Sequence, residues 1–65
     1  MEAHQTRAIQ ERDELETRID KLDVFLASAV RKTLDDAEQE RLTRQRALMG
    51  SYLNVLNERI AAFPK

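Results

Sequence analysis

The chain lacks cysteine and tryptophan, and its 65 residues include one glycine, one proline, one tyrosine and two phenylalanines. Without cysteine, neither a disulfide nor a thiolate-bound metal can compensate for its small size. Acidic and basic residues nearly cancel at a net charge of −1, whereas nonspecific nucleic-acid binders are usually basic. No apolar run approaches the roughly 18 residues of a membrane span, and the start lacks a signal peptide's apolar core. We therefore expect a cytoplasmic protein that binds neither membranes nor nucleic acid.

Two apolar series with the spacing of a helix face run through the chain. The first consists of Leu15, Ile19, Leu22, Leu26 and Ala29, and the second of Met49, Leu53, Leu56, Ile60 and Phe63. Steps of three and four residues keep one stripe of a helix facing a partner helix. An antiparallel register that places Ile19 opposite Met49 also places Leu15 opposite Leu53. The sequence thus predicts an all-α chain, a single antiparallel two-helix hairpin over residues 1–65.

The expected helices cover about residues 7–31 and 35–62, with the first six residues frayed. The first segment contains neither glycine nor proline and is rich in strong helix formers. At the start of the second, either Thr33 or Asp35 can serve as the N-cap. We expect Pro64 to stop the second helix, because proline has no backbone N–H to donate and its ring clashes with the preceding helical turn.

More apolar residues are present than one hairpin seam can cover. Val24, Phe25 and Val30 lie outside the seam of the first helix, and a further line of apolar residues follows the second. Since a second stripe requires a second neighbour, we expect a homo-oligomer, a dimer or larger, built as a helical bundle. The residues expected at its helix and subunit interfaces are Leu22, Phe25, Leu26, Val30, Leu48, Met49, Tyr52, Leu53, Val55, Leu56 and Ile60.

Three positions on the seams have two interpretations each. Arg12 and Arg46 fall opposite Leu56 and Leu22. Their guanidinium groups either reach water or pair with acids such as Glu16 or Asp23, or one or both face a cavity in the oligomer that is suited to phosphate or carboxylate. Gly50 costs about 1 kcal/mol relative to alanine in mid-helix. Either a close helix crossing or a ligand against bare backbone would explain it.

The remaining candidates for ligand binding are four arginines and the single tyrosine. The basic residues near the turn are interspersed with acids, which favours a salt-bridged surface, although an oligomer could assemble them into an anion site. The candidate ligand-binding residues are Arg41, Arg44, Arg46, Tyr52 and Arg59. His4 is the only histidine, so we expect no metal site, and we predict neither a cofactor nor catalysis.

A pattern of specific residues at fixed spacings extends over about 50 residues of the chain. It consists of Lys-Leu-x-x-Phe, a short turn, and Leu-x-x-Gln-x-x-x-Met-x-x-Tyr-x-x-x-Leu-x-x-Arg-Ile, which falls here on Lys21, Leu22, Phe25, Leu42, Gln45, Met49, Tyr52, Leu56, Arg59 and Ile60. This pattern resembles a family of very small helical-hairpin proteins of tailed bacteriophages and prophages. The interhelical turn is shorter here than in many of them. The resemblance assigns no binding residue.

What the resemblance implies is a small accessory protein in the host cytoplasm that acts against host defences. One hypothesis is an oligomeric, non-enzymatic sponge that sequesters an anionic nucleotide-derived immune signal, such as a cyclic nucleotide or an ADP-ribose derivative. The alternative is a helical interaction module that binds a host or phage protein through the apolar segment 22–30, with Phe25 as its anchor. A third possibility is a structural virion or assembly component, which no feature of the sequence selects.

Overall fold

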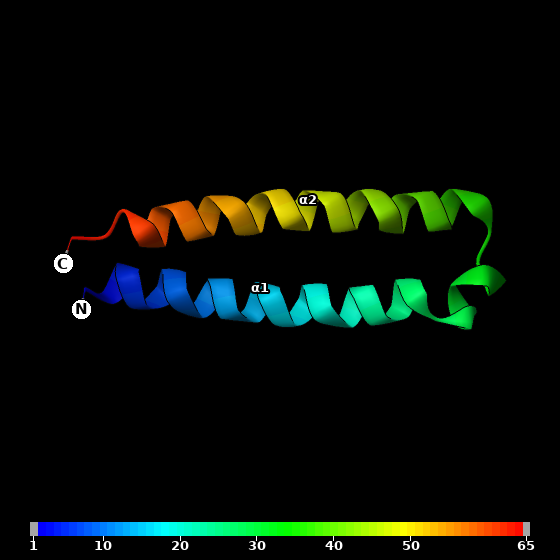
Figure 1. Cartoon of the computed structure of the whole chain (residues 1–65), viewed down its shortest axis with the longest axis horizontal. Coiled ribbons are helices and arrows are strands. Elements are labelled where there is room, and N and C mark those ends of the chain that lie inside the picture. Colours follow the sequence, from blue (N-terminus) through cyan, green and yellow to red (C-terminus); the bar gives the residue numbers. More distant parts are fainter. Residues whose placement is uncertain (1, 65) are drawn as a thin grey trace.

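The chain folds into two long antiparallel helices joined by a helical turn. The computed structural model describes residues 2–64. Helix α1 spans Ala3–Ala27, the 3-10 helix η1 spans Ala29–Thr33, and α2 spans Asp36–Ala61. The hairpin is a rod of 48 × 15 × 14 Å with both chain ends at the end remote from η1 (Figure 1). The predicted antiparallel hairpin is confirmed.

Helix α1 starts and ends four residues earlier than predicted. At its start, Gln5 and Glu2 form a capping box, in which the Gln5 side-chain oxygen accepts a 3.0 Å hydrogen bond from the Glu2 backbone N–H. This pairing satisfies two backbone donors that the first helical turn leaves free. It extends the helix into the segment expected to fray, of which Met1 lies outside the described residues.

The end of α1 is fixed by a serine. The Ser28 hydroxyl donates a 2.7 Å hydrogen bond to the Phe25 carbonyl, and its backbone is extended (φ −85°, ψ 159°). A side chain that bonds a nearby carbonyl offers the backbone an alternative to the helix. The next five residues form η1, in which the Thr33 hydroxyl bonds the Val30 carbonyl at 2.6 Å. The prediction of α-helix up to Arg31 is therefore wrong for its last four residues.

Helix α2 begins at the second of the two predicted caps. The Asp35 carboxylate accepts a 2.7 Å hydrogen bond from the Glu38 backbone N–H, and Asp36 adds another acid to the first turn. Negative charge is favourable there because the helix N-terminus carries partial positive charge. The helix ends at Ala61, one residue before the predicted end, and Pro64 follows shortly.

Three contacts between α1 and the segment from Asp36 to Phe63 test the predicted register. The rings of His4 and Phe63 meet edge to face with centroids 6.3 Å apart. Arg12 donates to the Asn57 side chain at 3.5 Å, and Arg46 donates to Asp23 at 2.6 Å. Each of these pairs lies within one residue of the position that the apolar series predicted. The register is confirmed.

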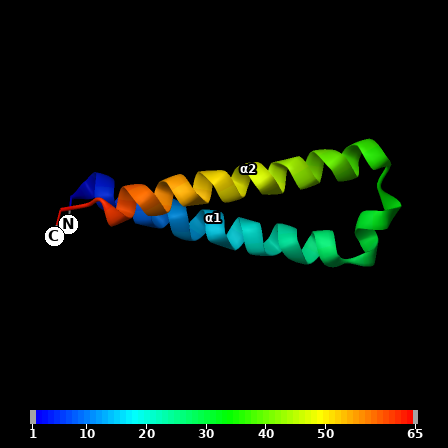
Figure 2. The same cartoon turned by 45° about the horizontal axis from the view of Figure 1, so that its top comes forward.

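The core of the hairpin is small and lies away from the turn. Leu56 is fully buried against Leu15 and Ile19, and Met49 and Leu53 pack on this cluster. Toward η1 the two helices move apart (Figure 2), and the predicted seam residues there, Leu22, Leu26 and Leu42, are only half-buried. Neither described helix has a stretch long and apolar enough to cross a membrane.

Shortening the central core residue should destabilise the hairpin strongly. We expect Leu56→Ala to lower the free energy of unfolding by about 2–5 kcal/mol, because the buried side chain leaves a cavity. Val24→Ala, at a side chain that is 73% exposed, is the matched control and should change it by less than about 0.5 kcal/mol. Urea denaturation followed by circular dichroism compares the two. Equal losses in both variants would contradict a core centred on Leu56.

Candidate functional site

One side of α2, beside its seam with α1, carries most of the candidate ligand-binding residues. We call it the outer face of α2 and define it as Arg41, Arg44, Leu48, Tyr52, Val55 and Arg59. Their spacing of three or four residues keeps them on one stripe of a helix. The three large side chains at its centre are unusually exposed, Leu48 at 65%, Tyr52 at 45% and Val55 at 49%. The outer face is thus apolar in the middle and basic at both ends.

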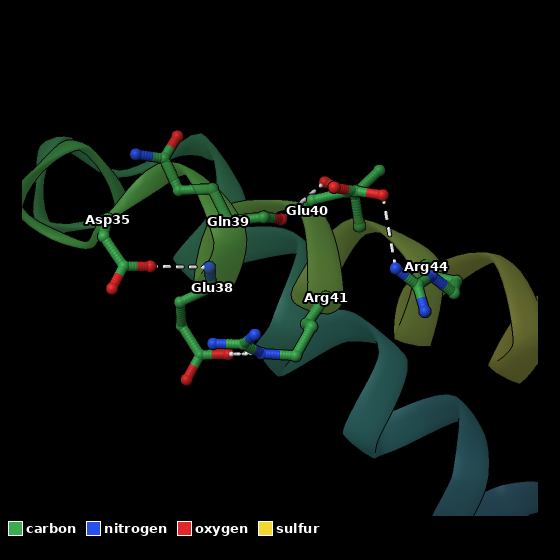
Figure 3. A network of polar contacts seen from close by, with 7 residues as sticks. Asp35, Glu38, Gln39, Glu40, Arg41 and Arg44 are labelled. Carbon is green, nitrogen blue, oxygen red and sulfur yellow. Dashed lines mark hydrogen bonds and ion pairs between the residues drawn. The ribbon is translucent and has the colours of Figure 1, made fainter.

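At the turn end of the outer face, two arginines pair with acids of the same helix. Arg41 lies 3.1 Å from the Glu38 carboxylate, and Arg44 lies 3.2 Å from the Glu40 carboxylate (Figure 3). These side chains are all half exposed or nearly so. Ion pairs of this kind contribute about 0.2–1 kcal/mol each, so an incoming anion can displace the acids at small cost.

At the middle of the outer face, Tyr52 contacts α1. Its hydroxyl donates a hydrogen bond to the Glu11 carboxylate. This bond raises the pKa of Tyr52, as do partial burial and the negative charge of Glu11, while the positive charge of Arg59 acts in the opposite direction. The contact orients the phenol ring and leaves the side chain 45% exposed.

Glu11 is the one residue of this arrangement that the sequence reasoning did not single out. It precedes the seam residue Leu15 by one helical turn, so it lies beside the seam and can reach across to α2. Its position beside the seam was the signal that the sequence offered. The sequence alone does not distinguish Glu11 from the other exposed acids, because the distinction depends on where the fold places Tyr52.

Arg59 lies at the far end of the outer face, two turns beyond Tyr52. Within residues 2–64 it forms no ion pair. Its guanidinium group is nevertheless close enough to influence the Tyr52 hydroxyl. Arg59 and Arg44 are separated by about 22 Å along the helix, at 1.5 Å per residue. One small anion cannot contact both in a single chain.

Arg46 lies on a different side of α2, in the seam with α1. Its Nε atom donates to the Asp23 carboxylate at 2.6 Å, and its side chain is 34% exposed. A β-carbon at Gly50 would lie 3.0 Å from the Arg46 Nη1 atom. The guanidinium group therefore lies over Gly50 on the next turn of α2, where a larger residue would require this flexible side chain to shift slightly.

The other seam arginine behaves in the same way. Arg12 pairs with Asp13 at 2.8 Å and approaches Glu16 at 3.7 Å, besides its contact with α2. In both seam arginines the apolar stem packs in the hairpin while the charged head meets acids near the surface. This arrangement agrees with the first of the two interpretations, in which the guanidinium groups pair with acids.

The structure therefore brings Arg41, Arg44, Tyr52 and Arg59 onto one surface and separates Arg46 from them. The described part of the chain encloses no pocket, so this surface is open. Nor do the described residues include a group of three or more histidine or acidic side chains placed to hold a metal ion.

Comparison with known proteins places the chain in a family. The family model described as Sequestin matches residues 2–62. The chain belongs to the Sequestin family. An uncharacterized 7.5 kDa protein in the denB-rIIB intergenic region of Enterobacteria phage T4 is 43% identical to it over 63 residues, covering 97% of this chain and 98% of the phage protein. No solved structure matches the chain. The predicted relationship to small phage proteins is confirmed.

The hydrogen bond between Tyr52 and Glu11 gives a testable titration in this Sequestin-family chain. Glu11→Ala should lower the pKa of Tyr52 toward its ordinary value, because both the acceptor and the negative charge are removed. Absorbance of tyrosinate as a function of pH reports on Tyr52 alone, since the chain has one tyrosine and no tryptophan.

The same shift has a consequence for stability. Because the pKa of Tyr52 is raised in the folded chain, the stabilisation from the bond is complete below the ordinary tyrosine pKa and is lost as pH rises through the raised value. Glu14→Ala removes another exposed acid of α1 and is the control. A pKa of Tyr52 that responds equally to both substitutions would show that general charge, and not the hydrogen bond, is responsible.

Proposed function

We propose that this Sequestin-family protein is an oligomeric, non-enzymatic sponge that sequesters an anionic, nucleotide-derived immune signal. The family name denotes sequestration, and the relative in phage T4 supports a role during infection of a host cell. Binding in this proposal is stoichiometric and without turnover. The protein lowers the free concentration of the signal in the cytoplasm by holding it.

The observation that carries the proposal is the alignment of Tyr52 with three arginines on the outer face of α2. Guanidinium groups bind phosphate through paired N–H donors, which gives both charge and directional fit. An aromatic ring can stack on a nucleobase, and such stacking contributes about 1–3 kcal/mol per base. Phosphate groups and a base are the two components of a nucleotide signal, and the outer face offers a matching group for each.

The contacts within the hairpin prepare this surface for exchange. Glu38 and Glu40 pair with Arg41 and Arg44 at the surface, and a phosphate replaces these acids with a stronger partner. Glu11 holds the Tyr52 ring from the side of α1. Arg46 takes no part, since its guanidinium group is bound by Asp23 in the seam.

Thermal denaturation in the presence of candidate ligands tests the proposal. Cyclic dinucleotides, cyclic trinucleotides and ADP-ribose derivatives are the ligands to compare, with calorimetry for any that shifts the melting temperature. A ligand at about 100 times its Kd should stabilise the folded protein by about 2.7 kcal/mol. If none of these compounds binds at about 100 μM, the sponge proposal is wrong.

Two variants locate the binding surface once a ligand is found. Arg59→Ala should remove most of the ligand-dependent shift, because it deletes a phosphate contact on the outer face. Arg46→Leu is the matched control: it removes the same charge from the seam, and should keep or raise the melting temperature while leaving the ligand shift unchanged. Loss of the shift in Arg46→Leu, with the shift intact in Arg59→Ala, would move the site from the outer face to the seam.

A second candidate function is supported by exposed apolar residues near the turn. Val24 is 73% exposed and Val30 is 57% exposed, beside the half-buried Phe25. These side chains could form the contact of a helical interaction module with a host or phage protein.

A binding assay separates the second candidate from the first. Under this alternative, the immobilised protein captures a stoichiometric protein partner from host lysate, and Val24→Asp abolishes the capture while circular dichroism shows unchanged helix content. Nucleotide binding should not respond to that substitution. If capture survives Val24→Asp, this apolar segment is not the contact.

A further inference from the structure

The part of the outer face of α2 from Arg44 to Arg59 has a pattern that reads the same in both directions along the helix. From Arg44 to Arg59 its members are basic, apolar, aromatic, apolar and basic. Leu48 and Val55 lie equally far from a midpoint between Ser51 and Tyr52, and so do Arg44 and Arg59. A surface that is used identically by two copies of one chain has to be self-complementary about a two-fold axis. This pattern meets that requirement for two antiparallel helices.

From this pattern and its exposure, we propose that a second copy of the chain docks antiparallel on the outer face of α2, with the two-fold axis between Ser51 and Tyr52. Leu48 of each copy then packs against Val55 of the other. These side chains are 65% and 49% exposed in the single hairpin, and the second copy covers them. Together with α1 of each copy, the two α2 helices form a four-helix bundle.

A second copy suits this surface better than an unrelated partner does. The hairpin buries few apolar side chains of its own, the four buried ones being Ala8, Leu15, Ile19 and Leu56. A chain this small gains more from sharing a second core than from exposing it. The other exposed apolar residues, Val24 and Val30, lie on α1 and η1 and show no comparable symmetry with each other.

The same register brings arginines of different copies together. Arg44 of one copy lies beside Arg59 of the other, and the two-fold axis repeats this pair at the opposite end of the interface. The roughly 22 Å that separates these residues within one chain is thereby removed, since each site takes one residue from each copy. If the proposed function holds, on which this step rests, each pair is a phosphate-binding site completed by the second copy. A nucleotide bound there would reach the Tyr52 ring, about 10 Å along the helix from Arg59, from the rim of the interface.

Like charges in contact make the dimer sensitive to anions. Arg44 is paired with Glu40 at the exposed surface, and this ion pair offsets only part of the repulsion between the two guanidinium groups. The unliganded dimer is therefore weakened, and an anion held between the two groups removes the repulsion. Because the anion binds the dimer better than the monomer, it must also strengthen dimerisation. Anion binding and assembly are then two aspects of one equilibrium.

The docking surface is tested by measuring self-association in analytical ultracentrifugation. Leu48→Asp and Val55→Asp place charges at the centre of the interface and should each raise the dimer dissociation constant at least tenfold. Val24→Asp adds the same charge at another exposed apolar position and should leave it unchanged. All three positions are exposed in the hairpin, so circular dichroism should show unaltered helix content. A monomeric unmodified protein, or equal effects of all three substitutions, would overturn the proposal.

A charge reversal tests the register. The contact between Arg44 of one copy and Arg59 of the other occurs at both ends of the interface, and Arg44→Glu replaces it by an ion pair at each end. This substitution should lower the dimer dissociation constant about tenfold. Arg41→Glu is the matched control, because it changes the net charge equally on the same helix but falls opposite Ala62 of the second copy. It should not tighten the dimer. Equal responses of the two variants, or weaker association of Arg44→Glu, would refute this register.

Inorganic pyrophosphate is the probe for the anion sites. It should tighten the dimer of the unmodified protein and have little effect on Arg44→Glu, in which the repulsion is already gone. Pyrophosphate that binds without any change in dimerisation would overturn the linkage.

The outcomes for the dimer and for the sponge are separable. A dimer that follows the substitution pattern while no nucleotide binds supports the docking surface and rejects the proposed function. Nucleotide binding that is unaffected by Val55→Asp supports the function and rejects the shared sites.

Discussion

The contact of Leu56 with Leu15 and Ile19 is the interaction on which the remaining structure depends. It is the place where both helices contribute fully buried or nearly buried side chains. Two helices of this length gain little stability in isolation, because most helical stability in proteins comes from packing of an apolar face. The contact fixes the register, and the register determines which side of α2 remains uncovered. The distribution of charge and exposed apolar area on the surface follows from it.

The seam also sorts the arginines into two groups that the sequence leaves mixed. Arg46 and Arg12 lie at the edge of the packed side chains, where their stems are partly covered and acids are within reach. Arg41 and Arg44 lie on the neighbouring side of α2, and each forms an ion pair with an acid of its own helix. Gly50 belongs to the first group, since its bare backbone accommodates the Arg46 guanidinium. The contact with Gly50 and the ion pair with Asp23 on α1 thus distinguish Arg46 from Arg41 and Arg44, whose acidic partners lie on their own helix.

Much of the fold could be predicted from the sequence because heptad spacing is a repeated signal. Ten apolar positions defined the seam, and the observed contacts of His4, Arg12 and Arg46 agree with it. The end of α1 could not be predicted in this way, since it depends on one hydroxyl, that of Ser28, competing for a carbonyl. The candidate site was predicted only as a set of residue types. The pairing of the seam arginines with acids such as Asp23 could be predicted, but Glu11 as the partner of Tyr52 could not, because its selection among many surface acids depends on three-dimensional position.

The start of α1 and the end of α2 lie together at the end of the rod that faces away from η1 (Figure 1). The seam contacts do not involve η1. The packing of the two helices therefore does not depend on which of them comes first in the chain. Joining the present ends by a short flexible linker and opening the chain within Ala29–Thr33 would give a circular permutant with the same seam. Such a permutant would carry its new ends beside Arg41 and Arg44, and leave the region around Phe63 continuous.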